Sequence, residues 1–123
     1  MPRRLTPAPA DQVAAARAAY DAGSATSADL RLLVKHHLAV LQEKAPGNSV
    51  EVRIPPYAAI QCIAGVRHTR GTPPAVIETD AATWLAIATG DLTWADALDS
   101  GRVRASGERT DLTSYLPLVP TTS

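Results

Sequence analysis

The sequence predicts one α+β domain, a sheet with helices on one face. The hydrophobic spacing changes from a period near 3.6 before Pro46 to a period of 2 in the segment VEVRI at 50–54. Three predicted strands then follow one another, and two predicted helices separate them from a fourth, which is the order typical of α+β proteins. The chain has 123 residues, enough for one hydrophobic core. We therefore expect a single domain over 11–119, between a flexible arm at 1–10 and a tail at 120–123.

The N-terminal part is predicted to form two helices. Residues 1–10 contain three prolines and no periodic pattern, which is typical of a mobile arm. A first helix from Asp11 is expected to end near Gly23, and a second to begin after Thr26 or Ser27 as N-cap and to run to Pro46. The second helix has an apolar stripe at helical spacing: Leu30, Leu33, Val34, His37, Leu38 and Leu41.

Two strands are expected after this helix. Alternation in 50–54 places Val50, Val52 and Ile54 on one face, with Glu51 and Arg53 on the other. A second strand within 57–65 has Ile60 and Cys62 on one face and Gln61 and Ile63 on the other. The connection through Pro55 and Pro56 is short, so the two strands are predicted to be antiparallel.

The C-terminal half is predicted as strand, helix, helix, strand and a last helical turn. The third strand lies in 74–80, and Thr79 or Asp80 caps a helix over 81–89 that Gly90 ends. A second short helix has Thr93 and Asp96 in capping-box-like spacing before Gly101. The following strand has Val103 and Ala105 facing inward, and Thr110 or Asp111 caps a turn that stops before Pro117. The expected buried helix residues are Trp84, Ile87, Trp94, Ala97 and Leu98.

The composition excludes several classes of protein. Twelve basic and twelve acidic residues give zero net charge, so no overall field attracts nucleic acid or an anionic membrane. No apolar run approaches the ~18 residues of a membrane span. No secretory signal is recognisable, and a cytoplasmic location is expected. The single cysteine, Cys62, excludes an intrachain disulfide and a thiolate metal cluster.

No catalytic or metal motif is recognisable. His36 and His37 are adjacent on a helix, so their side chains diverge by about 100° and cannot chelate one ion together. His37 is on the apolar stripe and is predicted to be a hydrogen-bonded core residue. Cys62 is predicted to be a small buried hydrophobe. With no phosphate loop, nucleophile triad or carboxylate pair, we expect a non-enzymatic protein without a cofactor or a metal.

The segment ETDAATWLAIATGDLTWADALDSGRVRASGERTDLTSYLPL resembles the C-terminal half of the sterol carrier protein type 2 family. The shared features are the Asp80-capped helix, the turn Thr89-Gly90-Asp91-Leu92, Ser100-Gly101, the strand at 103–106 and a closing helix with leucines. The segments at 50–62 and 67–80 look like small actinobacterial members. The resemblance implies a mostly antiparallel sheet of four or five strands, covered on one face by helices, with an apolar groove or tunnel between them.

The resemblance also implies a ligand. Members that carry lipids hold acyl chains, acyl-CoA or sterol in this space. Here the groove would be lined by Trp84, Ile87, Trp94, Leu98, Leu112 and Leu116. Arg67, His68 and Arg70 in the loop VRHTRGTPPAV would meet an anionic head group. We thus expect a small binding module for an apolar or acyl molecule.

Three alternatives stay open. A related domain forms the C-terminal part of mycothiol-dependent maleylpyruvate isomerases, so the chain could be an auxiliary domain of a thiol-dependent isomerase or transferase. It could instead be a protein-interaction module that meets a protein partner through a sheet edge or an apolar patch. The arginines on the outer face of the sheet, with Gln61, could bind a carboxylate or phosphate, or be solvated and paired with glutamates: Arg53, Arg102 and Arg104, with Glu51, Glu78 and Glu108.

Overall fold

The computed structural model describes residues 5–65, 75–107 and 110–118. Its elements are α1 (Ala10–Asp21), α2 (Ser27–Lys44), β1 (Val50–Ile54), β2 (Ala58–Cys62), β3 (Ala75–Thr79), α3 (Ala81–Thr89), α4 (Trp94–Asp99), β4 (Val103–Ser106) and the 3₁₀ helix η1 (Thr113–Tyr115). Their order agrees with the order that the sequence predicts.

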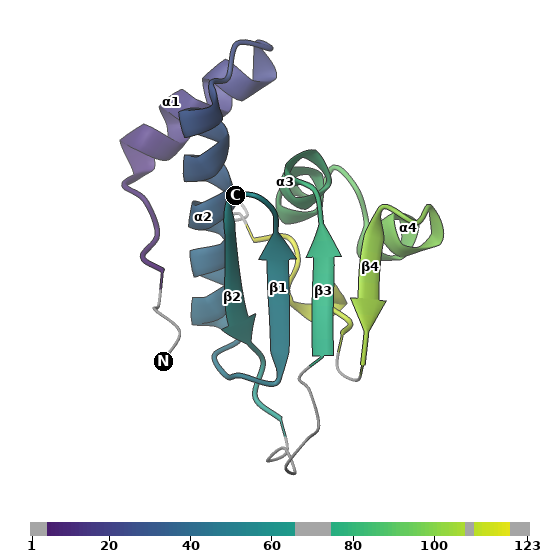
Figure 1. Cartoon of the computed structure of the whole chain (residues 1–123). Helices are drawn as coiled ribbons and strands as arrows, with labels where there is room; N and C mark the ends of the chain where they lie inside the picture. The colour runs from purple at the N-terminus through teal and green to yellow at the C-terminus, as the bar shows by residue number, and fades with distance from the viewer. Residues whose placement is uncertain (1–4, 66–74, 108–109, 119–123) are drawn as a thin grey trace.

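The strands form one four-stranded sheet in the order β2-β1-β3-β4. β1 pairs with β2 and β3 pairs with β4 in antiparallel fashion, while β1 and β3 are parallel. The helices α2 and α3 pack together on one face of this sheet, and α4 lies beside β4 (Figure 1). The predicted α+β class with a mostly antiparallel sheet is confirmed, with one parallel pair at its centre.

Alternation of side chains in the strands builds the core. Val50, Val52 and Ile54 are fully buried beneath the helices, whereas Arg53 is exposed on the opposite face. The core is closed by bulky side chains from α2 and α3, among them Leu33, Leu38, Leu41, Trp84, Leu85 and Ile87. The hydrophobic periodicity of the sequence therefore decides which face the helices cover.

Three expected orientations are wrong. Ile63, which alternation places on the outer face, is buried, because its φ of 66° breaks the extended backbone after β2. Ala105 and Leu98 were expected to face the core, but both are exposed. β4 is an edge strand in which only Val103 is buried, and α4 is a helix of six residues that buries only Trp94 and Ala97.

The helix boundaries follow local capping. The Thr26 side chain accepts a hydrogen bond from Asp29 N and the Asp29 carboxylate accepts one from Thr26 N, a complete capping box that starts α2. The Asp80 side chain accepts a hydrogen bond from Thr83 N at the start of α3, and the Thr93 side chain accepts one from Asp96 N at the start of α4. Gly90 ends α3 in the left-handed conformation, as predicted.

The C-terminal segment returns across α3. The turn that was expected near 111–116 is a 3₁₀ helix, preceded by the Asp111 carboxylate, which accepts hydrogen bonds from Thr113 N and Oγ1 at 2.9 and 2.6 Å. Leu112 is fully buried. Leu118 N donates to Ala88 O at 2.8 Å, which attaches the end of the described chain to α3.

The N-terminal segment is attached to α2. Within the predicted flexible arm, Leu5 N donates to Gln42 Oε1 at 3.3 Å and Ala8 N donates to His36 Nδ1 at 3.0 Å. Further along, Arg17 on α1 is paired with Asp21 at 3.0 Å and lies 3.7 Å from Asp91 in the α3–α4 loop. The helix α1 is thus connected to the domain through the surface of α2 and this loop.

His37 makes the stability depend on pH. It is 3% exposed, and burial lowers its pKa from 6.5 to about 4, with smaller contributions from the charges of His36 and Arg17. Its prediction as a core residue is confirmed, although its Nδ1 has no hydrogen-bond partner among the described residues. The neutral form is therefore the one that the fold requires.

We expect the free energy of unfolding to be at its full value above pH 6.5 and to fall as the pH drops towards 4. The unfolded chain takes up a proton at His37 near pH 6.5, but the folded chain does not. This difference lowers the free energy of unfolding by about 2 kcal/mol between pH 7.5 and pH 5. Urea denaturation at these two pH values measures it. His37→Leu should remove most of the difference. His36→Leu should remove a smaller part of it, because burial lowers the pKa of His36 as well. Equal slopes in all three proteins would contradict the assignment.

Candidate functional site

Three predicted ligand residues line one apolar pocket. Ile87 on α3, Trp94 at the start of α4 and Leu116 after η1 surround a cavity of about 230 Å³. We call it the apolar pocket, and its remaining lining residues are Gly90, Leu92, Thr93, Thr113 and Pro117. Its walls thus come from α3, from the α3–α4 loop with α4, and from the C-terminal segment.

Local sequence signals position these walls. Gly90 reverses the chain after α3, and Thr93 caps α4 so that Trp94 becomes its first residue. The C-terminal segment is fixed by the hydrogen bond from Leu118 N to Ala88 O. The sequence predicts Thr93 as a helix cap and Pro117 as a helix stop, but it does not predict that both residues line a pocket. Capping patterns contain no information about which segments meet in space.

Trp84 and Leu112, also predicted to line a groove, lie in the core instead. They are 1% and 0% exposed, and neither lines the apolar pocket. Trp84 Nε1 donates to Val34 O at 3.4 Å, so its polar atom is used within the fold. The space between the helices and the sheet, where the resemblance implies a groove or tunnel, is occupied here by these side chains together with those of α2.

A second cavity of about 320 Å³ shares two lining residues with the apolar pocket. Trp94 and Thr113 line both cavities, and the other lining residues of the second are Ala95, Leu98, Asp99, Thr110 and Asp111. Leu98, another predicted ligand residue, is 38% exposed here. We call this cavity the acidic pocket, since its charged lining residues are the two aspartates. Sequence reasoning treated Asp111 only as a cap and did not single out Asp99.

The predicted head-group residues Arg67, His68 and Arg70 lie outside the described part of the chain. They stay a prediction. What the structure does place is the start of their loop: Ile63, whose N–H donates to Ala45 O at 2.6 Å and whose carbonyl accepts from Ser49 N and Oγ at 3.1 and 2.6 Å.

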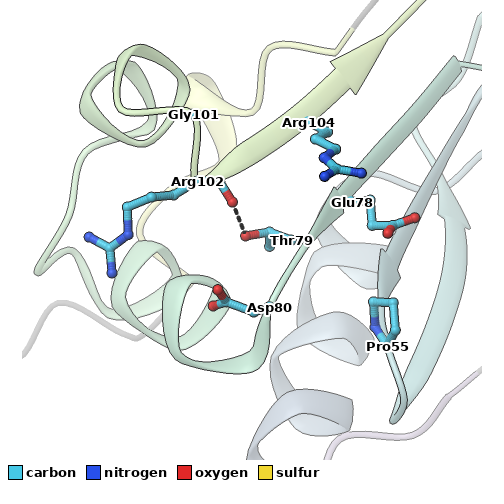
Figure 2. A pocket seen from close by; sticks show the side chains of 7 residues that line it. All are labelled: Pro55, Glu78, Thr79, Asp80, Gly101, Arg102 and Arg104. Atoms are coloured by element: carbon cyan, nitrogen blue, oxygen red, sulfur yellow. Dashed lines mark hydrogen bonds between the residues drawn. The ribbon is translucent and has the colours of Figure 1, made fainter.

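The arginines of the sheet lie along a polar cleft of about 410 Å³, lined by Pro55, Glu78, Thr79, Asp80, Gly101, Arg102 and Arg104. Register places Glu78 between Arg53 and Arg104 on neighbouring strands. Figure 2 shows Arg104 extending towards Glu78 while Arg102 extends to the other side, so the two guanidiniums diverge.

This cleft balances its own charges. It has two arginines against Glu78 and Asp80, and Arg53 is paired with Glu51 at 2.8 Å. The Thr79 hydroxyl donates to Arg102 O at 2.7 Å and fixes the floor (Figure 2). The arrangement favours the alternative of a solvated, charge-paired face over an anion clamp, which needs converging guanidiniums.

Cys62 does not have the environment of a reactive thiol. Cys62 is buried, and this burial raises the pKa of its thiol to about 12, so the nucleophilic thiolate is suppressed. Among residues 5–65, 75–107 and 110–118, no three His, Cys, Asp or Glu side chains are grouped to hold a metal ion. Within the same ranges, no helix has the length and hydrophobicity that crossing a membrane requires.

Comparison with known proteins identifies the domain. A search of the curated proteins finds no match. A family model described as bacterial SCP ortholog matches residues 26–118. The match begins at Thr26, the N-cap of α2, so that α1 precedes it, and it ends at Leu118, which is hydrogen-bonded to α3. The chain belongs to the bacterial SCP ortholog family and is a sterol carrier protein-like domain.

Proposed function

We propose that this protein is a non-enzymatic binding module that holds an apolar ligand in the apolar pocket. The observation that supports it is the pocket lining of Ile87, Trp94, Leu116 and Leu92 in a sterol carrier protein-like domain. Apolar walls with a few polar groups at the edge are typical of small-molecule sites. The hydroxyls of Thr93 and Thr113 provide such groups.

The proposed site differs in place from the one that the family resemblance implies. The interior between helices and sheet is filled by fully buried side chains such as Leu38 and Trp84. The apolar pocket has about 230 Å³, and typical ligand cavities begin at about 300 Å³. We therefore propose that the pocket holds one apolar segment of a ligand, such as part of an acyl chain, while the rest of the molecule lies along the surface.

Calorimetric titration with ten-carbon probes tests the proposal. Decanol is added to the full chain below its aqueous solubility, and decanoate and decyltrimethylammonium are added below their micellar concentrations. We expect measurable binding of at least one probe, and a loss of about tenfold or more in the Leu116→Arg variant, since a buried or half-buried guanidinium in an apolar pocket lacks a partner.

A matched variant separates pocket effects from charge effects. Ala82 is an exposed residue of α3 that lines neither pocket. Ala82→Arg therefore adds the same positive charge as Leu116→Arg, but outside both pockets. It should bind the probes as the natural chain does. If no probe binds at the highest of these concentrations, or if both variants bind equally well, the apolar pocket is not a ligand site.

The other hypotheses gain no specific support from the described residues. An auxiliary role in a thiol-dependent isomerase or transferase, and a role as a protein-interaction module, remain predictions of the sequence. The anionic head group that Arg67, His68 and Arg70 were expected to meet likewise remains a prediction.

A further inference from the structure

Residues 5–21, which we call the strap, are held on α2 by few contacts. The strap consists of the N-terminal segment and α1, and it precedes the part of the chain that the family model matches. Its helix packs mainly on α2 and buries only Ala16 (Figure 1). A helix of twelve residues is marginal in water without such packing. The strap therefore depends on α2 for its order.

A hydrogen bond to His36 positions the start of α1. Ala8 N donates to His36 Nδ1 at 3.0 Å. Ala8 lies between Pro7 and Pro9, which have no N–H, so it provides the only backbone donor of these three residues. Pro9 is the N-cap of α1 and makes no side-chain cap. The bond to His36 is thus the polar contact that joins the start of this helix to α2.

This bond requires the neutral form of His36. Its Nδ1 accepts a hydrogen bond only while it carries no proton, so the ring proton is on Nε2. In the imidazolium both ring nitrogens are donors, and Nδ1–H would then face the N–H of Ala8. Protonation of His36 therefore breaks the contact and places two donors against each other.

The surroundings of His36 disfavour its protonation while the strap is attached. Burial lowers the pKa of His36, and the opposing effect of Glu43 on the same helix is smaller. The ring of His37 lies 5.1 Å from that of His36, and Arg17 of α1 lowers the pKa of His37. The segment before α1 and the helix α3 have no titratable side chain, and β2 has only a buried thiol. No other element that packs on α2 thus provides a charge to compensate.

The remaining charges of the strap hold it only weakly. Arg17 pairs with Asp21 at 3.0 Å and with Asp91 in the α3–α4 loop at 3.7 Å, and both carboxylates are largely exposed. Asp11 is exposed at the start of α1. Ion pairs in water contribute little to stability, so these contacts do not replace the bond to His36.

From these contacts we infer that the strap is acid-sensitive: protonation of His36 releases residues 5–21 from α2 while the rest of the domain stays folded. The connection to α2 can act as a hinge, since a Cβ on Gly23 would meet nothing within 4 Å. The pKa of His36 is lowered in the attached chain, so attachment is complete above pH 6.5 and is lost as the pH falls below it. The inference does not depend on the proposed function, because no strap residue lines the apolar pocket.

Thiol labelling distinguishes release of the strap from unfolding of the domain. In the Ala16→Cys variant the introduced thiol lies in the contact with α2, whereas the natural Cys62 is buried in β2. Both are labelled with dithiodipyridine, which reacts with thiols in acid, and each rate is divided into the rate of the urea-unfolded chain at the same pH. This ratio is the protection of the thiol.

We expect the protection of the introduced thiol to fall about fivefold or more between pH 7.5 and pH 5. The ceiling is about thirtyfold for one histidine that titrates at 6.5 in the released chain only. Cys62 should stay at least about tenfold better protected at both pH values, since local release costs less than unfolding. If both thiols have the same protection, α1 leaves only when the domain unfolds, and the inference is wrong.

Variants of residue 36, made in the Ala16→Cys chain, assign the effect. His36→Gln keeps an oxygen that can accept from Ala8 N but does not titrate, so the introduced thiol should stay protected at pH 5. His36→Lys has a charge and no acceptor, so protection should be weak even at pH 7.5. Lys35→Gln changes the charge of the neighbouring residue and leaves the Ala8 contact intact, so the fall should persist. A fall of the same size in His36→Gln overturns the inference.

The natural chain provides a second measurement that needs no new thiol. In an NMR titration the amide of Ala8 and the ring of His36 should change with one midpoint, which lies below pH 6.5. An Ala8 amide that does not respond when His36 titrates would contradict the inference, whatever the labelling shows.

Discussion

Gly47→Ala is expected to lose about 4 kcal/mol of unfolding free energy, which is much of what a domain of this size has. A Cβ at this position would overlap the carbonyl group of Ile63 and the nitrogen of Ala64. The φ of Gly47 is +150°, a value that residues with a side chain rarely adopt. Urea denaturation of the purified variant measures the loss, and failure to fold is its extreme form.

The neighbouring backbone cannot move to make room for this methyl group. The N–H of Ile63 donates to Ala45 O at 2.6 Å, and its carbonyl accepts from Ser49 N and Oγ. These bonds join the end of α2, the start of β1 and the end of β2, so relief of the overlap would break contacts between three elements. The effect should therefore be global and not confined to the turn.

Gly23→Ala is the matched control. Gly23 also has a positive φ, +77°, but a Cβ there would meet nothing within 4 Å. We expect a loss of only about 1 kcal/mol, which is the conformational cost alone. Similar losses in the two variants would show that the close approach at Gly47 is not what stabilises the turn.

Leu112→Ala is expected to lose about 3 kcal/mol, because Leu112 is fully buried in the core and its truncation leaves a cavity. A leucine lining an open ligand groove would instead be partly solvated, and its removal would change affinity more than stability. The comparison thus separates a packing role from the ligand role that the sequence suggested. Chemical denaturation without ligand gives the measurement.

Leu98→Ala serves as the comparison for this residue. Leu98 is 38% exposed on the wall of the acidic pocket, so its truncation should cost at most about 0.5 kcal/mol. If Leu112→Ala cost no more stability than Leu98→Ala, the placement of Leu112 in the core would be wrong. The prediction of Leu112 as a ligand-lining residue would then stand.

The candidate site was predictable in part. Ile87, Trp94 and Leu116 could be selected as apolar residues in C-terminal elements, and these three do line one pocket. Trp84 and Leu112 have the same sequence signature, yet they lie in the core. Hydrophobicity and spacing identify residues that avoid water, but they do not distinguish the wall of an open pocket from the interior, because both are apolar.

The sequence by itself determined the elements and their ends. Period-2 alternation marks β1, the Thr26 capping box marks the start of α2, and Asp80 and Gly90 bound α3. These features depend on hydrogen bonds and steric preferences within a few residues, so they can be identified without knowing the fold.

Only the tertiary structure decided how the elements meet. It placed β3 parallel to β1, left Leu98 and Ala105 exposed, and put Trp94 and Thr113 on the walls of two pockets. Such contacts join residues far apart in the chain, and they depend on which face another element happens to cover. Local propensity does not determine which face another element covers, so the apolar pocket and the acidic pocket become visible only once the domain is assembled.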